Sequence, residues 1–162
     1  MTTAKILVVF LCAAIGTACG YAVMRRYKRD KCYIDGVVKM VDELKHNISY
    51  RRDKLSDILG GIAPESDGLK KNIDEYVSYL NGQSETLDLT RGRTPQNVHA
   101  QVRELFGALG SSDERTQIER LNGFSETFSK LKCDADERFR KYGSAAVKLG
   151  FLFGLGIGVL TL

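Results

Sequence analysis

The sequence predicts an all-α protein, an antiparallel helical bundle flanked by an N-terminal and a C-terminal transmembrane helix. Apolar residues recur every three or four positions along most of the 162-residue chain, which is the spacing of one buried helical face. The chain has only two prolines, and no run alternates between apolar and polar residues as a half-buried strand would. Both ends carry long apolar runs, which is the composition of membrane spans.

The N-terminal apolar run, residues 6–24, predicts an uncleaved membrane anchor over residues 1–24. Its nineteen uncharged residues are enough to cross a bilayer as a helix. A signal peptide is the alternative, because Lys5 gives a charged start and Thr17-Ala18-Cys19 faintly resembles a lipoprotein cleavage site. Five bases directly after the run favour the anchor, since such clusters stay on the cytoplasmic side. These bases are Arg25, Arg26, Lys28, Arg29 and Lys31.

Residues 25–141 are predicted to form one cytoplasmic helical bundle. The first helix continues out of the membrane to about Tyr50, and a short helix follows the capping residue Asp53 and ends at Gly60-Gly61. The next helix covers about residues 68–81. The predicted buried residues of these helices are Ile34, Val37, Val38, Val41, Leu44, Ile48, Leu55, Ile58, Leu59, Leu69, Ile73, Tyr76, Val77 and Leu80.

A polar, glycine-containing stretch, residues 83–93, predicts a loop before the fourth helix. Thr94 is expected at the N-cap of that helix and Pro95 at its first helical position. Gly110 is expected to end the helix. Its predicted buried residues are Val98, Val102, Leu105, Phe106 and Leu109.

The final helix is predicted to run unbroken from Ser111 to Leu162, beginning in water and ending in lipid. Ser111 and Glu114 fit a capping box. An apolar stripe follows, and after Lys148 it becomes a run that is apolar on every side, which predicts a second anchor over residues 142–162. The stripe consists of Ile118, Leu121, Phe124, Phe128, Leu131, Ala135, Phe139 and Tyr142.

Three glycines in the final run, Gly150, Gly154 and Gly158, are predicted to mediate membrane packing. They form two overlapping motifs with a spacing of four residues. Glycine weakens a helix in water but is common where membrane helices approach closely. The alternative is a hydrophobic tail that packs in a soluble core.

The charge distribution assigns the basic character of the chain to the membrane boundaries. Four bases, Arg138, Arg140, Lys141 and Lys148, precede the second apolar run, so both termini are expected across the membrane from residues 25–141. The chain has a net charge of +4, from 24 bases and 20 acids. Without the nine juxtamembrane bases and Asp30, fifteen bases and nineteen acids are left. We therefore expect a lipid membrane as partner and no nucleic acid.

No pattern of catalytic, cofactor-binding or metal-binding residues is evident, so we expect neither an enzyme nor a cofactor. The four cysteines, Cys12, Cys19, Cys32 and Cys133, lack the paired spacing of a zinc or redox site. Cys32 and Cys133 lie on helices that we expect to be neighbours, as two unpaired thiols. The two histidines, His46 and His99, are isolated. The acidic cluster Asp134, Asp136 and Glu137 is expected on a solvated face or in ion pairs with neighbouring arginines.

Two short motifs, in this order and in a chain of this length, resemble the stage III sporulation protein AB family of endospore-forming bacteria. The first is Leu-Gly-x-x-Asp-x-x-x-Gln, and the second is Leu-Gly-Phe followed by a glycine three residues later. Their residues are Leu109, Gly110, Asp113 and Gln117, then Leu149, Gly150, Phe151 and Gly154. The resemblance covers nearly the whole chain.

The resemblance implies a mother-cell protein in the membrane around the forespore, as part of a secretion-like channel complex required for sporulation. The soluble domain of the family is similar to the helical domains of the type II secretion platform protein, the F-type component. The expected partners are a secretion-type ATPase, stage III sporulation protein AA, and other membrane subunits, the latter through Gly150, Gly154 and Gly158. The implied role is a scaffold without catalysis, and homo-oligomerisation is compatible with it.

Two other functions stay open at this point. One is an exported helical lipoprotein or envelope-binding module, which requires cleavage before Cys19. The other is a membrane-anchored adaptor of a cytoplasmic enzyme.

Overall fold

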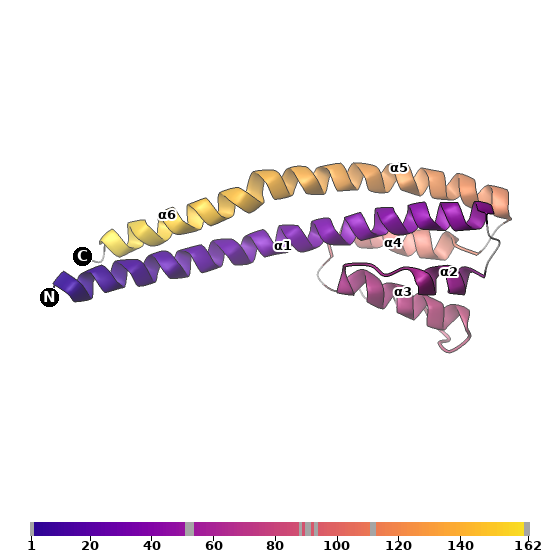
Figure 1. Cartoon of the computed structure of the whole chain (residues 1–162), viewed down its shortest axis with the longest axis horizontal. Helices are drawn as coiled ribbons and strands as arrows, with labels where there is room; N and C mark the ends of the chain where they lie inside the picture. The colour runs from indigo at the N-terminus through magenta and orange to yellow at the C-terminus, as the bar shows by residue number, and fades with distance from the viewer. Residues whose placement is uncertain are drawn as a thin grey trace. The chain divides into compact units, whose positions relative to one another are not determined.

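The computed structural model describes residues 2–50, 54–87, 89, 92, 94–110 and 113–160. The elements are α1 (Thr2–Tyr50), α2 (Leu55–Gly61), α3 (Asp67–Leu80), α4 (Gln96–Ala108), α5 (Glu114–Arg138), the π-helical segment η1 (Phe139–Gly143) and α6 (Ser144–Leu160) (Figure 1). No strand occurs among the described residues. The predicted all-α fold is confirmed.

The chain divides into two compact units. The terminal unit contains Met1–Lys31 and Asp134–Leu162, and the central unit contains Cys32–Cys133. Helix α1 contributes residues to both units. The anchors predicted over residues 1–24 and 142–162 lie within the terminal unit, and their membrane boundaries stay a prediction.

The core of the central unit is built from large apolar side chains around the second half of α1. Val37, Met40, Val41 and Leu44 are fully buried there. The other helices contribute Ile58 and Leu59 from α2, Leu69, Ile73 and Tyr76 from α3, Val98, Val102, Leu105 and Phe106 from α4, and Leu121 and Phe128 from α5. Apolar burial of this kind is the main stabilising contribution to a soluble helical domain.

Polar contacts fix how α3 packs in the central unit. The amide of Asn72, which is buried, donates a hydrogen bond of 3.0 Å to the Tyr33 hydroxyl on α1. The Tyr76 hydroxyl donates to the carbonyl oxygen of Leu109, at 3.1 Å, just beyond α4. A buried polar group needs such a partner to offset its lost hydration.

Several predicted core positions of the central unit are only partly buried. Val38, Ile48, Leu55 and Val77 are half-buried. Leu80 was predicted to be buried and is 38% exposed. It is the last residue of α3, and the chain turns away at Gly82, whose φ is 72°. Helical periodicity gives the direction of a side chain but not the point at which the neighbouring helices stop covering it.

The starts of two helices differ from the sequence predictions. Pro95 is the N-cap of α4, not its first helical residue, and its carbonyl accepts the bond from the N–H of His99 at 3.0 Å. At α5 the carbonyl of Asp113 accepts the first helical bond, from the N–H of Gln117. The predicted capping residues Ser111 and Asp53, and the side chain of Glu114, lie outside the described part of the chain.

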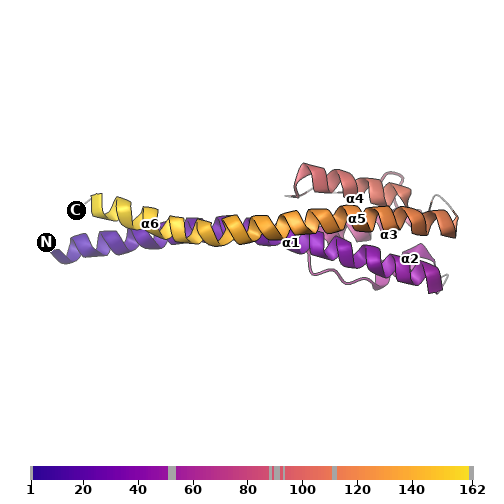
Figure 2. The ribbon, with the colours of Figure 1, turned by 90° about the horizontal axis from the view of Figure 1, so that it is seen from above.

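Within the terminal unit, the first part of α1 lies beside α6 and runs antiparallel to it (Figures 1 and 2). Both ends of the chain therefore lie at the same end of this unit. This arrangement brings the two predicted anchors into contact with each other.

The prediction of one unbroken final α-helix is wrong, because η1 separates α5 from α6. About eighteen residues make five turns of an α-helix, so an unbroken helix would direct Ile157 the same way as Phe139. Instead Gly158 is buried and Ile157 is 55% exposed. A π-helical turn holds about one residue more than an α-helical turn, which rotates everything after η1 by about 100°.

The same rotation corrects the predicted apolar stripe. Leu121 and Phe128 are buried, but Tyr142, its last member, is 56% exposed. Gly143 takes the inward position, 3.6 Å from the Met24 side chain when measured from the site of a Cβ. The remaining members of the stripe, Ile118, Phe124, Leu131, Ala135 and Phe139, are half-buried.

Candidate functional site

In the terminal unit the backbones of α1 and α6 touch directly. A Cβ atom at Gly154 would lie 2.9 Å from the Cα of Ala13, and one at Gly150 would collide with the carbonyl oxygen of Gly16. A Cβ at Gly158 would be equally crowded by α1. All three glycines predicted to mediate packing therefore face α1 of the same chain. In the structure of the single chain, α1 packs against them.

The matching glycines on α1 were missed in the sequence prediction. Gly16 lies against Gly150, and Gly20 lies against the carbonyl oxygen of Ala146. Gly16 and Gly20 have the same four-residue spacing as the α6 glycines, and this spacing is the signal that would have identified them. Small residues on both partners let two helices approach closely, as they do in membrane helix pairs.

The outward surface of the same helix pair is apolar. The exposed large apolar residues include Leu7, Phe10, Leu11 and Ile15 on α1, and Leu149, Leu152, Phe153, Ile157 and Leu160 on α6. Large exposed apolar surfaces of this kind mark an interaction with a membrane or another molecule. By length and composition, two helices among the described residues are able to cross a membrane, Leu7–Ile48 and Arg115–Leu160.

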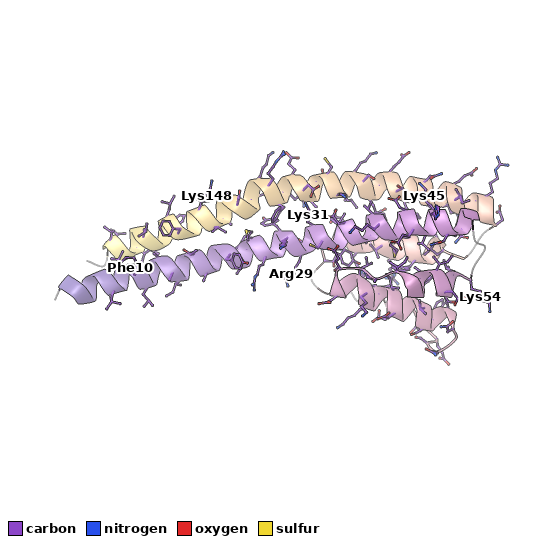
Figure 3. The ribbon with its side chains drawn as sticks, viewed as in Figure 1. Phe10, Arg29, Lys31, Lys45, Lys54 and Lys148 are labelled. Carbon is purple, nitrogen blue, oxygen red and sulfur yellow. The ribbon has the colours of Figure 1, made fainter. Side chains whose placement is uncertain are left out.

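The predicted juxtamembrane bases come together at one level of the terminal unit, which we call the basic neck (residues 25–31 and 136–141). Lys31 on α1 forms an ion pair of 2.7 Å with Asp136 on α5, and in Figure 3 its label lies between the two helices. The exposed bases of the neck are Arg25, Arg26, Lys28, Arg29, Arg138, Arg140 and Lys141. Lys148 is exposed further along, on α6 (Figure 3).

The acids of the neck lie among these bases. Glu137 pairs with Lys141, and the hydrogen bond between them lowers the pKa of Glu137 and raises that of Lys141. Partial burial raises the pKa of Asp30, although Arg26, Arg29 and Arg138 act in the opposite direction. The neck therefore carries more exposed positive charge than its acids balance.

Tyrosines mark the boundary between the basic neck and the apolar surface. The rings of Tyr27 on α1 and Tyr142 in η1 stack with centroids 6.1 Å apart. The Arg25 guanidinium lies 4.8 Å from the centre of the Tyr21 ring, in the geometry of a cation–π contact. Tyrosine is enriched at the level where a membrane helix meets the headgroups.

The first motif that suggested the family shapes the turn between α4 and α5, in the central unit. Leu109 is buried, and Gly110 has a φ of 74°, which favours glycine. The Asp113 carboxylate accepts a long hydrogen bond, 3.4 Å, from the N–H of Thr116. The hydroxyl and N–H of Thr116 lower the pKa of Asp113. Gln117 is half-buried. These residues close a turn and cap a helix, which is a structural task.

The second motif lies in α6. Leu149 and Phe151 point outward, with exposures of 52% and 46%, while Gly150 and Gly154 face α1. The motif therefore combines a close helix contact on one side with an apolar surface on the other.

The other candidate residues do not form a site in the described part of the chain. No group of three or more His, Cys, Asp or Glu side chains is arranged to hold a metal there. Cys12, Cys19, Cys32 and Cys133 are free cysteines, and Cys133 is exposed. His46 is exposed and His99 is half-buried. Asp134 and Glu137 are exposed, whereas Asp136 is half-buried and paired with Lys31.

A family model described as stage III sporulation protein AB matches residues 5–162. This match covers the whole central unit and all of the terminal unit except its first four residues. No curated protein and no solved structure matches the chain.

Proposed function

The chain belongs to the stage III sporulation protein AB family, and on that premise we propose that this sporulation protein is a membrane-anchored scaffold without catalysis. The central unit stands in the cytoplasm of the mother cell, at the membrane around the forespore. There it couples a secretion-type ATPase, stage III sporulation protein AA, to the membrane subunits of a secretion-like channel.

The observation that carries this proposal is the glycine contact between α1 and α6. It holds the two apolar ends of one chain together, with Gly16 against Gly150 and Ala13 against Gly154. A body held by two paired anchors is fixed to the membrane more firmly than one on a single flexible tether. Such a body is suited to transmit force or position between a cytoplasmic enzyme and membrane subunits.

Two further features support the proposed topology. The exposed bases of the neck come from α1 and from the end of α5 and η1, which lead into α6, and bases at the end of a span stay in the cytoplasm. Cleavage before Cys19, as a lipoprotein requires, would remove Ala13 and Gly16, which the α6 glycines contact. The helix pair therefore favours an uncleaved α1.

Because α1 packs against Gly150, Gly154 and Gly158, we assign contacts with other membrane subunits to the outward apolar residues of the α1–α6 pair. Phe153 and Leu152, which are 69% and 60% exposed, are two of these residues on α6. The ATPase would bind the polar exterior of the central unit.

Thiol accessibility in intact cells tests the topology. In a variant with Cys133 as its only cysteine, a membrane-impermeant thiol reagent is expected to react only after lysis, since Cys133 is exposed in the central unit. The assay uses vegetative cells that express the chain in their outer cytoplasmic membrane, because the space around a forespore is closed to the reagent. The matched control lacks all four native cysteines and carries Thr3→Cys, which should react in these intact cells. Labelling of Cys133 in intact cells would place the central unit outside and refute the proposal.

Purification from membranes tests the coupling. The full-length chain should retain the secretion-type ATPase, and a chain whose outward residues Leu152 and Phe153 are changed to Ala should keep the ATPase but lose membrane subunits. Failure of the full-length chain to retain any ATPase under mild detergent would refute the coupling role.

A further inference from the structure

We propose that the basic neck of the terminal unit binds the phosphate groups of anionic phospholipids. This proposal rests on the membrane-anchored function above. The neck holds eight Lys and Arg against three Asp and Glu. A cluster of bases next to a membrane span attracts anionic lipid, and each base contributes roughly a five-fold increase in affinity.

The position of the tyrosines places the neck at the depth of the lipid phosphates. The stretch of helix between Tyr142 and Leu160 rises about 27 Å, close to the hydrocarbon thickness of about 30 Å. Tyr142 stands at one end of this apolar stretch and Tyr27 stacks on it, while Tyr21 follows Gly20, which lies against Ala146 one turn further along. Aromatic residues at such an end meet the headgroups. The bases next to them then face the phosphate layer.

The chemistry of the bases suits phosphate. Five of the eight are arginines, whose planar group donates two parallel hydrogen bonds to a phosphate. Two of the three acids are already paired within the neck, Asp136 with Lys31 and Glu137 with Lys141. Arg26 and Arg29 stay exposed on α1, Arg138 at the end of α5 and Arg140 in η1.

Lys148 extends the same surface toward the hydrocarbon. It is exposed on α6, about 9 Å of helical rise beyond Tyr142. Side chains in a helix tilt toward its N-terminus, and the N-terminus of α6 adjoins the neck. The ammonium of Lys148 can therefore reach back to the phosphates while its stem lies along apolar surface.

Native mass spectrometry of the full-length, delipidated protein in detergent tests this proposal. Phosphatidylglycerol and phosphatidylcholine with identical acyl chains are titrated separately. The native protein should bind phosphatidylglycerol at least about ten-fold more tightly than phosphatidylcholine. The variant R26Q/R29Q/R138Q/R140Q should lose most of this preference. The variant R26K/R29K/R138K/R140K keeps the four positive charges, so it should keep the part of this lipid preference that depends on charge alone.

The matched control removes four exposed bases from the central unit, as K54Q/K70Q/K71Q/R103Q, and changes the net charge by the same amount. Its preference should equal that of the native protein. An equal loss in this control, or no preference in the native protein, overturns the proposal. Loss of a co-purifying subunit from the arginine variant, with its lipid preference intact, overturns it in favour of a protein partner.

Carbonate extraction of membranes from the same strains separates this proposal from the proposed function. Native and arginine variants should both resist extraction. Extraction of the native protein would refute the membrane anchor itself, whereas resistance without a lipid preference refutes only the phosphate site.

Discussion

The terminal and central units are both helical, but they are held together by opposite kinds of residue. In the central unit large side chains such as Leu105, Phe106 and Phe128 fill the space between helices. In the terminal unit glycines remove that space, so that the backbones of α1 and α6 meet. The outer surfaces are reversed as well, polar around the central unit and apolar along the α1–α6 pair.

This difference is the one expected if, as proposed, the central unit lies in water and the terminal unit lies in lipid. In water, helices associate because burial removes large apolar surfaces from contact with water. In lipid that driving force between helices is absent, so close van der Waals packing of small residues takes its place. Helix α1 takes part in both arrangements, with Gly16 and Gly20 in one unit and Val37 and Leu44 in the other.

The largest expected effect lies in the central unit. Leu105→Ala should lower the free energy of unfolding by about 2–5 kcal/mol, because it leaves a cavity in a fully buried site. Leu80→Ala, at a position 38% exposed, is the matched control and should change it by less than about 1 kcal/mol. Chemical denaturation of the full-length protein in detergent measures both. Equal losses of stability in the two variants would contradict the assignment of Leu105 to the core.

One alanine inserted after Val147 should disrupt the terminal unit. The insertion should turn Phe153 and Ile157 toward α1 in place of Gly154 and Gly158, because one added residue rotates the rest of α6 by about 100°. Deletion of Tyr142 is the matched control, because it removes the extra residue of η1 and leaves Gly154 and Gly158 facing α1 through a regular α-helical turn. We expect the apparent Tm in detergent to fall and sporulation to fail for the insertion alone. An equal loss after the deletion would argue against control of register by η1.

Gly154→Val tests a single contact of the pair. Its side chain would meet the Cα of Ala13, and overpacking of this kind destabilises by about 1–3 kcal/mol. Gly156→Val is the matched control, because a Cβ there meets nothing within 4 Å. Thermal stability in detergent should fall for the first variant alone. A similar fall for both would indicate a loss of helix flexibility instead of a lost contact.

Tyr76→Phe should have the smallest effect, about 1 kcal/mol, through loss of the bond to the Leu109 carbonyl. Burial, with a smaller contribution from Tyr79, raises the pKa of Tyr76 to about 12 from 10.0. The folded state favours the neutral phenol, so its contribution to stability is complete below pH 10 and is lost as pH rises through about 12. Denaturation midpoints between pH 9 and 12 should therefore fall less steeply in the variant. Parallel curves for the two proteins would contradict this assignment.

The apolar spacing and the charges in the sequence were enough to predict most of the helices of this protein. The helices from α1 to α4 were predicted within a few residues, because glycine, proline and polar clusters separate clear apolar stripes. Gly150, Gly154 and Gly158 were predicted to be membrane-packing residues from their spacing alone. The two motifs indicated the family, which the match over residues 5–162 confirms.

Only the tertiary structure decided what these residues touch. It assigned the three glycines to α1 and revealed Gly16 and Gly20 as their partners, because a four-residue glycine spacing marks a helix as able to pack closely but does not say which helix is its partner. It also placed η1 at Phe139–Gly143, where the sequence has no proline that would indicate a break in the helix. The rotation that η1 introduces depends on how the chain packs before and after it. A prediction from regular helical spacing therefore placed Tyr142 on the buried face, although its side chain is exposed.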